Sequence, residues 1–320
     1  MNETPELRLD DMPGLLDATF PARSEGPRFL WPGDKPLAAV VAVVVEYFQP
    51  SQPVLYSGGP SVLPAPIPPG AFDFMNWTWR SYGNRIGLWR LLDVLEARNV
   101  PVSAITNARL HEVYPEITSA LLKAGWNLSA AHGYIQDRSL LEFYDDLDGH
   151  RDYIKHSLQS HQAATGVTPT GWLSPAGGLL PETFSVLAAN GIEWVGAFQC
   201  DDRPFSLDLG VKRLIAMPHS TDLTDYHVFT RAHLPGSAYA ELVRETVDVL
   251  SEEGSSTGAG RVVVLSAHPH VMGQPSRIRH FDAVVADLQT RSDIWWATQD
   301  DIASYCRAKF ESTTTSAQPT

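Results

Sequence analysis

One pattern recurs along the chain: a short, continuous apolar run followed by a segment with helical periodicity. The runs do not alternate apolar with polar residues, as strands with one exposed face do, so they predict strands buried on both faces. The strand-like segments are AAVVAVVVEYF (38–48), PVSAITN (101–107), NLSAAHG (127–133), TGWLSP (170–175), EWVGAFQ (193–199), VKRLIAMPH (211–219), RVVVLSAHP (261–269) and IWWATQ (294–299). The repeat predicts a parallel sheet with helices on both faces.

The intervening segments support this interpretation. GLWRLLDVLEARN (87–99) places four leucines on one helical stripe, and PEITSALLKAG (115–125) begins on proline and ends on glycine. Further helix-like segments are LPETFSVLAANG (180–191), AYAELVRETVDVLSEEG (238–254) and SRIRHFDAVVADLQ (276–289). Seven or eight strand–helix units favour a closed arrangement over an open sheet. We therefore predict an α/β fold, a (β/α) barrel of about seven parallel strands.

The domain organisation follows from where this pattern begins and ends. We expect an N-terminal arm over residues 1–36, a single barrel domain over 37–310 and a disordered tail over 311–320. The segment QPSQPVLYSGGPSVLPAPIPPG (49–70) interrupts the pattern with seven prolines in 22 residues. An insertion of that length directly after the first strand is expected to be a lid or substrate wall, or else an arm that contacts another subunit.

The net charge of the chain indicates which classes of molecule it can bind. The chain has 24 Lys and Arg against 37 Asp and Glu, a net charge of −13. Nucleic acids and anionic membranes are therefore poor partners, and a small-molecule substrate fits better. The longest apolar run, LAAVVAVVV (37–45), has nine residues, whereas a membrane-spanning helix needs about 20.

The N-terminal residues and the cysteines suggest a compartment. MNETPELRLDDMPG has neither a basic region nor an apolar core, so we expect no secretory signal. Cys200 and Cys306 are too few for a disulfide framework or a metal knuckle, and we interpret them as thiols in a reducing compartment. We expect a cytoplasmic protein.

Polar residues stand where the predicted strands end. In parallel β/α folds the carboxyl ends of the strands meet at one rim, where binding and catalytic groups gather. The residues at these ends are Glu46, Asn107, His132, Trp172, Asp201 with Asp202, His219, and His268 with His270. We expect them to converge on one site.

Each of these residues also has a structural interpretation. Glu46 closes an apolar run, which suggests a functional acid, although it could instead pair with Arg85 at the surface. His132 could be a hydrogen-bonded core histidine, and Asp201-Asp202 could be a turn. The sequence His268-Pro269-His270 carries more information, because proline fixes the backbone and imidazole titrates near neutral pH.

Several cofactor and nucleophile motifs are missing from the sequence. No GxGxxG follows a predicted strand, and there is no Walker-type loop, so we expect no nucleotide cofactor. GWLSPAGG contains Ser174 but lacks the GxSxG pattern of serine hydrolases.

The ordered set WTWRSYGNRIGLWRLLDVL, HGYIQD, GWLSPAG, QCDDRPF, MPHSTDLTDYHVF and LSAHPHVMGQPSRI resembles polysaccharide-deacetylase-like (NodB-homology) proteins. More narrowly, it resembles the branch that contains metal-independent allantoinases and cyclic imide hydrolases. The resemblance covers about residues 36–305. It implies a distorted (β/α) barrel, a homo-oligomer and hydrolysis of a non-peptide amide C–N bond.

The chain departs from the metal-dependent members of that family. They carry an aspartate on the first strand, where this chain has Ala42 and Val44, and an H-x-x-x-H pair, here His132 and Gln136. The arginine of the family's RxP element is Leu173 here. An amide is a poor zinc ligand compared with imidazole. We therefore expect a site without a tightly held metal and without another cofactor.

From the resemblance and the strand-end residues we predict Glu46, His132 and His268 as the catalytic groups. Glu46 would activate water, His132 would donate to the oxyanion and His268 would be the acid for the leaving nitrogen. The predicted substrate-binding residues are Arg85, Asn107, Trp172, Asp202 and His270.

Two other functions stay open on sequence alone. One is a metal-dependent de-N-acetylase with a divalent metal on rearranged ligands such as Glu46, His132 and His268. The other is a non-hydrolytic relative, either a binding protein or an enzyme of specialised metabolism.

Overall fold

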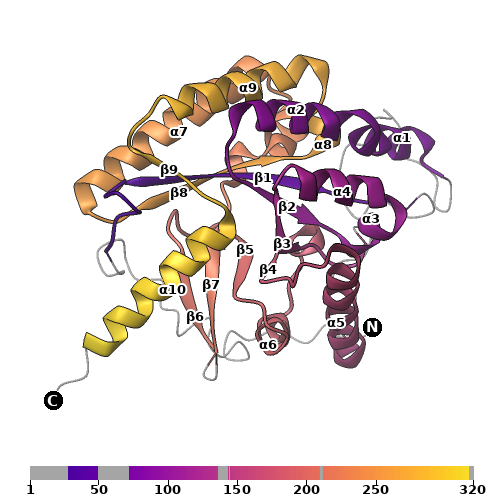
Figure 1. The fold of residues 1–320 in the computed structure, drawn as a ribbon, viewed down its shortest axis with the longest axis horizontal. Coiled ribbons are helices and arrows are strands. Elements are labelled where there is room, and N and C mark those ends of the chain that lie inside the picture. Colours follow the sequence, from indigo (N-terminus) through magenta and orange to yellow (C-terminus); the bar gives the residue numbers. More distant parts are fainter. Residues whose placement is uncertain (1–27, 50–71, 136–142, 144, 210–211, 317–320) are drawn as a thin grey trace, which may run out of the picture.

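The computed structural model describes residues 28–49, 72–135, 143, 145–209 and 212–316 of the 320-residue chain. Within these ranges nine strands form one sheet (Figure 1). They are β1 (Leu37–Val45), β2 (Val102–Thr106), β3 (Asn127–Ala131), β4 (Gly171–Trp172), β5 (Trp194–Phe198), β6 (Phe205–Asp208), β7 (Arg213–Pro218), β8 (Arg261–Ala267) and β9 (Ile294–Trp296).

The strand order is β6-β7-β5-β4-β3-β2-β1-β8, with β9 pairing β1. Every pairing is parallel except that of β6 with β7. The predicted parallel α/β architecture with about seven main strands is therefore confirmed. Each of the eight strand-like segments predicted from the sequence overlaps an observed strand.

The two ends of the sheet approach each other without forming a regular ladder. Single hydrogen bonds join them: the Val262 amide donates to the Asp202 carbonyl at 2.9 Å, and the Val264 amide donates to the Ser220 hydroxyl at 3.0 Å. This seam makes the structure a distorted barrel, as the family resemblance implied.

Most helices cover the outside of the sheet, whereas α10 (Gln299–Ser316) packs against its inner face (Figure 1). The other helices are α1 (Phe74–Tyr82), α2 (Leu88–Arg98), α3 (Ala108–Val113), α4 (Pro115–Lys123), α5 (Leu147–Thr165), α6 (Pro181–Ala189), α7 (Gly236–Thr257), α8 (Pro269–Met272) and α9 (Pro275–Gln289). Shorter helical segments are η2 (Gly83–Gly87), η4 (Pro175–Gly177), η5 (Thr221–Leu223) and η6 (Tyr226–Arg231). The predicted leucine stripe of α2 is buried.

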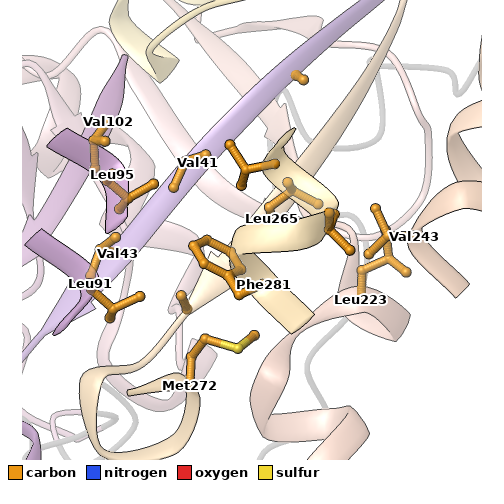
Figure 2. Close-up of a cluster of buried hydrophobic side chains, with 14 of the residues drawn as sticks. Val41, Val43, Leu91, Leu95, Val102, Leu223, Val243, Leu265, Met272 and Phe281 are labelled. Atoms are coloured by element: carbon orange, nitrogen blue, oxygen red, sulfur yellow. The ribbon is translucent and has the colours of Figure 1, made fainter. Parts of the chain in front are cut away.

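Side chains of β1 alternate between two apolar layers, because successive residues of a strand point to opposite faces. The odd-numbered residues 37–45 pack against the outer helices. Figure 2 shows part of this outer layer, where Val41 and Val43 of β1, Leu95 of α2 and Phe281 of α9 gather. Because both faces of β1 are buried, its sequence is a continuous apolar run.

The even-numbered residues of β1, from Ala38 to Val44, face the interior of the barrel. Side chains of α10, among them Cys306 and Phe310, complete this inner layer, together with Trp31. Trp31 donates from its indole nitrogen to the Arg261 carbonyl at 2.7 Å and stacks on Trp295. Residues 28–36 of the predicted arm therefore include an anchor that is buried against the barrel.

Strand β6 was not predicted. FSLD is only four residues long and alternates apolar with polar side chains, unlike the other strands, because it pairs antiparallel with β7 at an edge of the sheet. Helix α10 continues to Ser316, past residue 310, where we expected the tail to begin. The proline-rich insertion lies outside the described residues except for Gln49.

No helix in the described ranges is both long enough and apolar enough to cross a membrane.

Two histidines lie in the outer core, away from the rim of the barrel. His111 hydrogen-bonds Thr106 and Thr118 through its two ring nitrogens, both at 2.7 Å, and His161 donates from Nε2 to the Leu128 carbonyl at 2.8 Å. The two rings meet edge to face. Burial lowers the pKa of His111 to about 3, with a further contribution from His161, and burial lowers the pKa of His161 to about 4.

We predict that these histidines make the fold acid-sensitive. Below about pH 6.5 these histidines bind protons in the unfolded chain but stay neutral in the folded protein. As the pH falls, each ring therefore lowers the free energy of unfolding by about 1.4 kcal/mol per pH unit, until the pH reaches its folded pKa. His161→Gln should reduce the slope between pH 6.5 and about 4 by about that amount in urea unfolding measurements. His156→Gln, on the exposed face of α5, is the matched control. An unchanged slope in the His161 variant would contradict the prediction.

Candidate active site

A cavity of about 260 Å³ opens at the carboxyl ends of the strands. Its described lining combines acids, bases and aromatic side chains from segments that are far apart in the sequence. The polar and charged residues are Glu46, Arg80, His132, Ser174, Gln199, His219, Thr221, Thr224, Tyr226, His227, Arg231, Ser266 and His268. Val44, Phe48, Leu173 and Gly177 complete the wall.

The alternation of side chains explains why three polar residues meet here. Glu46 continues the even-numbered inner row of β1, two residues after Val44. In the same way, His268 continues the inward-pointing row of β8, and His219 continues the inward-pointing row of β7. Each is the first inward-pointing position beyond its strand, so the inner apolar layer ends in a ring of polar groups.

Glu46 and His132 form a buried pair. Nε2 of His132 lies 3.0 Å from Oε1 of Glu46, and Nδ1 lies 2.6 Å from the Leu173 carbonyl oxygen. A carbonyl only accepts hydrogen bonds, so Nδ1 carries a proton, and the Nε2–Oε1 contact requires one more proton between the two groups. The pair is therefore either imidazolium with carboxylate or imidazole with carboxylic acid. In both forms its net charge is zero.

His268 is held by Asp225, which is fully buried. One carboxylate oxygen of Asp225 accepts from Nδ1 of His268 at 2.7 Å, and the other accepts from the His268 backbone amide at 2.6 Å. This double contact fixes the ring and leaves Nε2 as the nitrogen available to the cavity. Burial by itself lowers the pKa of His268, but the Asp225 charge and hydrogen bond and the charge of Glu46 outweigh it, so the pKa is raised.

His219 differs from His268 although both line the cavity. Burial lowers the pKa of His219 to about 4, and the nearby positive charge of His268 adds to the effect. His219 is therefore a neutral imidazole at pH 7, whereas His268 is the ring favoured as imidazolium. The two histidines therefore differ in charge because their surroundings differ.

Arg80 and Tyr226 occupy another wall of the cavity. The Arg80 guanidinium lies 4.7 Å from the centre of the Phe48 ring, and its positive charge acts on the Tyr226 hydroxyl. Burial is the largest cause that raises the pKa of Tyr226. Tyr226 therefore keeps its proton and can donate it in a hydrogen bond.

Ser174 offers a second hydroxyl. Its Oγ accepts from the indole nitrogen of Trp172 at 2.8 Å, and the residue is 2% exposed. Because Oγ accepts from Trp172, its own O–H remains available to donate toward the cavity.

Of the predicted catalytic residues, Glu46, His132 and His268 all line this cavity. The role we expected for His132 changes, because its two ring nitrogens already have Leu173 and Glu46 as partners. In this geometry His132 positions Glu46 rather than donating to an oxyanion.

Two predicted substrate-binding residues lie elsewhere. Arg85 is exposed on η2 and lines a separate surface hollow with Trp89 and Tyr114, because its segment faces away from the barrel mouth. Asn107 is buried, and its side-chain amide hydrogen-bonds only the backbone. Its Oδ1 accepts from the Leu110 and Tyr47 amides, and its Nδ2 donates to the Tyr47 carbonyl. Asn107 thus caps α3 instead of facing the cavity.

Trp172 and Asp202 also lie outside the cavity lining. Trp172 points into the outer core on β4, and its neighbour Leu173 takes the inward position. Trp172 acts only through its hydrogen bond to Ser174. Asp202 has an exposed side chain and contributes its backbone carbonyl to the barrel seam.

His270, predicted to bind substrate, lies behind the cavity wall. It is buried, and its ring meets Trp79, Phe48 and Tyr226 edge to face. Burial lowers its pKa well below the usual value, and the charge of His268 adds to this. Asp225, not His270, is the residue that orients His268.

Reasoning from strand ends missed Asp225 and Arg80, and it considered Ser174 only as a nucleophile. Asp225 lies outside the strands, in the loop TDLTD, where nothing distinguishes it from Asp222 three residues earlier. Arg80 comes from α1, an element that we had not predicted. Only the fold brings Asp225 next to the His268-Pro269-His270 turn.

The residues present do not fit a structural or catalytic metal site of the usual kind, which needs at least three protein ligands. Among the residues that the structure describes, no three His, Cys, Asp or Glu side chains are grouped so that they could hold one ion. Ala42 and Val44 are buried and apolar. Gln136 lies outside the described residues.

Comparison with known proteins confirms the resemblance to polysaccharide-deacetylase-like proteins. The chain is 26% identical, over 253 residues, to a Schizosaccharomyces pombe (strain 972 / ATCC 24843) protein named "Putative polysaccharide deacetylase"; the match covers 71% of this chain and 75% of that protein. No family model matches the chain.

Solved structures share the fold. Puue allantoinase superimposes with a TM-score of 0.78 at 22% identity, covering 89% of this chain and 95% of that one. A probable polysaccharide deacetylase from Pseudomonas aeruginosa PAO1 superimposes with a TM-score of 0.77 at 23% identity, covering 87% and 93%. The barrel seen here is therefore an architecture that a deacetylase-like protein and an allantoinase both have.

We predict that Asp225→Asn lowers the pKa of His268, because it removes the buried charge that offsets burial of the ring. The measurement is a pH titration of histidine side-chain NMR signals, with His268→Asn used to assign the signal. Asp222→Asn, at an exposed position in the same loop, is the matched control. If His268 titrates at the same pH in the Asp225 variant as in the wild-type protein, Asp225 does not set its charge.

Proposed function

Because this chain shares its fold with deacetylase-like proteins and an allantoinase, we propose that it hydrolyses a non-peptide amide C–N bond. The substrate is a small cyclic imide or ureide, and no tightly bound metal takes part. One observation carries the proposal: a carboxyl–imidazole pair, Glu46 with His132, lines one small cavity together with His268, a histidine held by Asp225.

Such a reaction needs three groups. A base must take a proton from water, a donor must stabilise the oxyanion, and an acid must protonate the leaving nitrogen. Cyclic imides and ureides suit a site without a Lewis acid because their carbonyls are activated and their nitrogen is a good leaving group.

Glu46 is the base in this mechanism. In the imidazolium–carboxylate form of the pair, His132 holds one oxygen of Glu46 through Nε2, and the second oxygen can accept a proton from water. The hydrogen bond from Nδ1 to Leu173 fixes the ring, so the carboxylate is oriented before substrate binds. His132 is thus a positioning residue for the base.

His268 is the acid. Its raised pKa favours the imidazolium form, and the Asp225 contact directs Nε2–H to the cavity. The hydroxyls of Ser174 and Tyr226 are the candidate donors for the oxyanion, since both line the cavity and both retain an O–H to donate.

The steps balance without a further reactant. Water forms the new C–O bond as its proton passes to Glu46, and the carbonyl oxygen becomes the oxyanion. The C–N bond then breaks as His268 gives its proton to the nitrogen. Glu46 afterwards releases a proton and His268 takes one up from solvent, which restores both groups.

Cavity size favours a small ring over a polymer. At about 260 Å³, the cavity is below the range of roughly 300–1,000 Å³ that is usual for drug-sized ligands. The name of the yeast relative points instead to a polysaccharide substrate, and N-acetylated glycan oligomers therefore belong in the assay beside cyclic imides and ureides.

We predict that Glu46→Gln lowers kcat by about 10²–10⁴-fold on whichever ring the wild-type protein opens, because the amide cannot take the proton of water. The assay follows ring opening of succinimide, dihydrouracil and hydantoin by liquid chromatography. Glu96→Gln, on the exposed face of α2, controls for the substitution. A loss below tenfold in a folded variant would exclude Glu46 as the base.

Metal removal gives a separate test. We expect that protein dialysed against a strong chelator retains its activity, and that added zinc does not increase it. Elemental analysis of the same sample by plasma mass spectrometry should find metal far below stoichiometry. Near-stoichiometric zinc, with activity lost on chelation and restored by zinc, would favour the metal-dependent alternative.

A further inference from the structure

The cavity carries more positive than negative charge. The Glu46–His132 pair sums to zero, and Asp225 balances the imidazolium form of His268. Arg80 and Arg231 also line the cavity, and among the described residues neither forms a salt bridge. A chain with a net charge of −13 therefore presents two unbalanced cations to its ligand.

Arg80 is the more enclosed of the two. Its guanidinium lies over the Phe48 ring, 4.7 Å from the centroid, and its charge acts on the neighbouring Tyr226. Its Nε is buried and has no hydrogen-bond partner in the described part of the chain. Arg231, in contrast, is exposed at the mouth.

A buried donor without an acceptor is costly, and more so when it is charged. The sequence between Phe48 and α1 contains one acid, Asp73, which caps the helix by accepting from the Asn76 amide at 2.9 Å. The carboxylate of Glu46 is engaged with His132, and that of Asp225 with His268. The acceptor that Arg80 lacks is then best provided by the ligand.

We propose that Arg80 binds a carboxylate on the substrate, so that the preferred substrates are cyclic imides or ureides that carry an acidic side chain. The guanidinium fork matches the two oxygens of a carboxylate, which a neutral ring carbonyl does not. The inference rests on the proposed function, which supplies the class of ring. It concerns the side chain of the substrate and not the C–N bond that is cleaved.

The test compares two ligands that differ in one charge: hydantoin-5-acetic acid and its neutral amide, hydantoin-5-acetamide. Binding is measured by calorimetry and turnover by chromatography, each for wild type, Arg80→Gln and Arg80→Lys. Arg85→Gln is the matched control, because Arg85 is exposed and lies outside the cavity.

We expect wild type to prefer the acid over the amide by about 10- to 100-fold, the range for a charge-assisted hydrogen bond. Arg80→Gln should remove the preference, Arg80→Lys should retain part of it because lysine keeps the charge but not the fork, and Arg85→Gln should keep it. Equal binding of the acid and the amide by wild type, or a preference that survives in Arg80→Gln, would overturn the proposal.

The two proposals fail differently. If the acid binds more tightly than the amide through Arg80 but neither ring is opened, carboxylate recognition stands and the hydrolase function is wrong. If both rings are opened at equal rates and Arg80→Gln changes neither rate, the hydrolase function stands and carboxylate recognition is wrong.

Discussion

The site depends on one constraint, the alternation of side chains along parallel strands. Residues of β1, β7 and β8 that point inward form an apolar layer, and the next inward position past each strand is Glu46, His219 or His268. The same alternation buries the odd-numbered residues of β1 under the outer helices. In each inward-pointing row, the residues within the strand form the apolar core and the residue just past the strand belongs to the site. A shift of one residue in a strand would exchange its inner and outer faces.

Hydrogen bonds from outside the cavity then give each polar group a defined role. The Leu173 carbonyl fixes the ring of His132, which holds Glu46, and the buried Asp225 holds His268 by both its ring and its backbone. His219, without such a partner for its ring among the described residues, stays neutral. In the mechanism we propose, these hydrogen-bond partners decide which lining group is the base and which is the acid.

Local sequence pattern predicted the parallel sheet and the leucine stripe of α2. The strand ends together with the family resemblance predicted Glu46, His132 and His268, which the structure brings to one cavity. It could not predict which way a residue near a strand end points. Asn107 turns to cap α3, Trp172 occupies the outer face of β4, and Arg85 faces solvent from η2. Arg80 and Asp225 were missed for a different reason. Arg80 comes from α1 and Asp225 is at the N-cap position of η6, and only tertiary structure brings Arg80 to the cavity and Asp225 to His268.

The most direct test is a crystal structure of Glu46→Gln, which should bind substrate without turning it over, soaked with hydantoin-5-acetic acid. We expect the ring inside the cavity, with the nitrogen of the scissile bond near Nε2 of His268 and the carboxylate on Arg80. A ring bound outside this cavity, or a metal ion on His132 in contact with the ring, would contradict the metal-free assignment of base and acid.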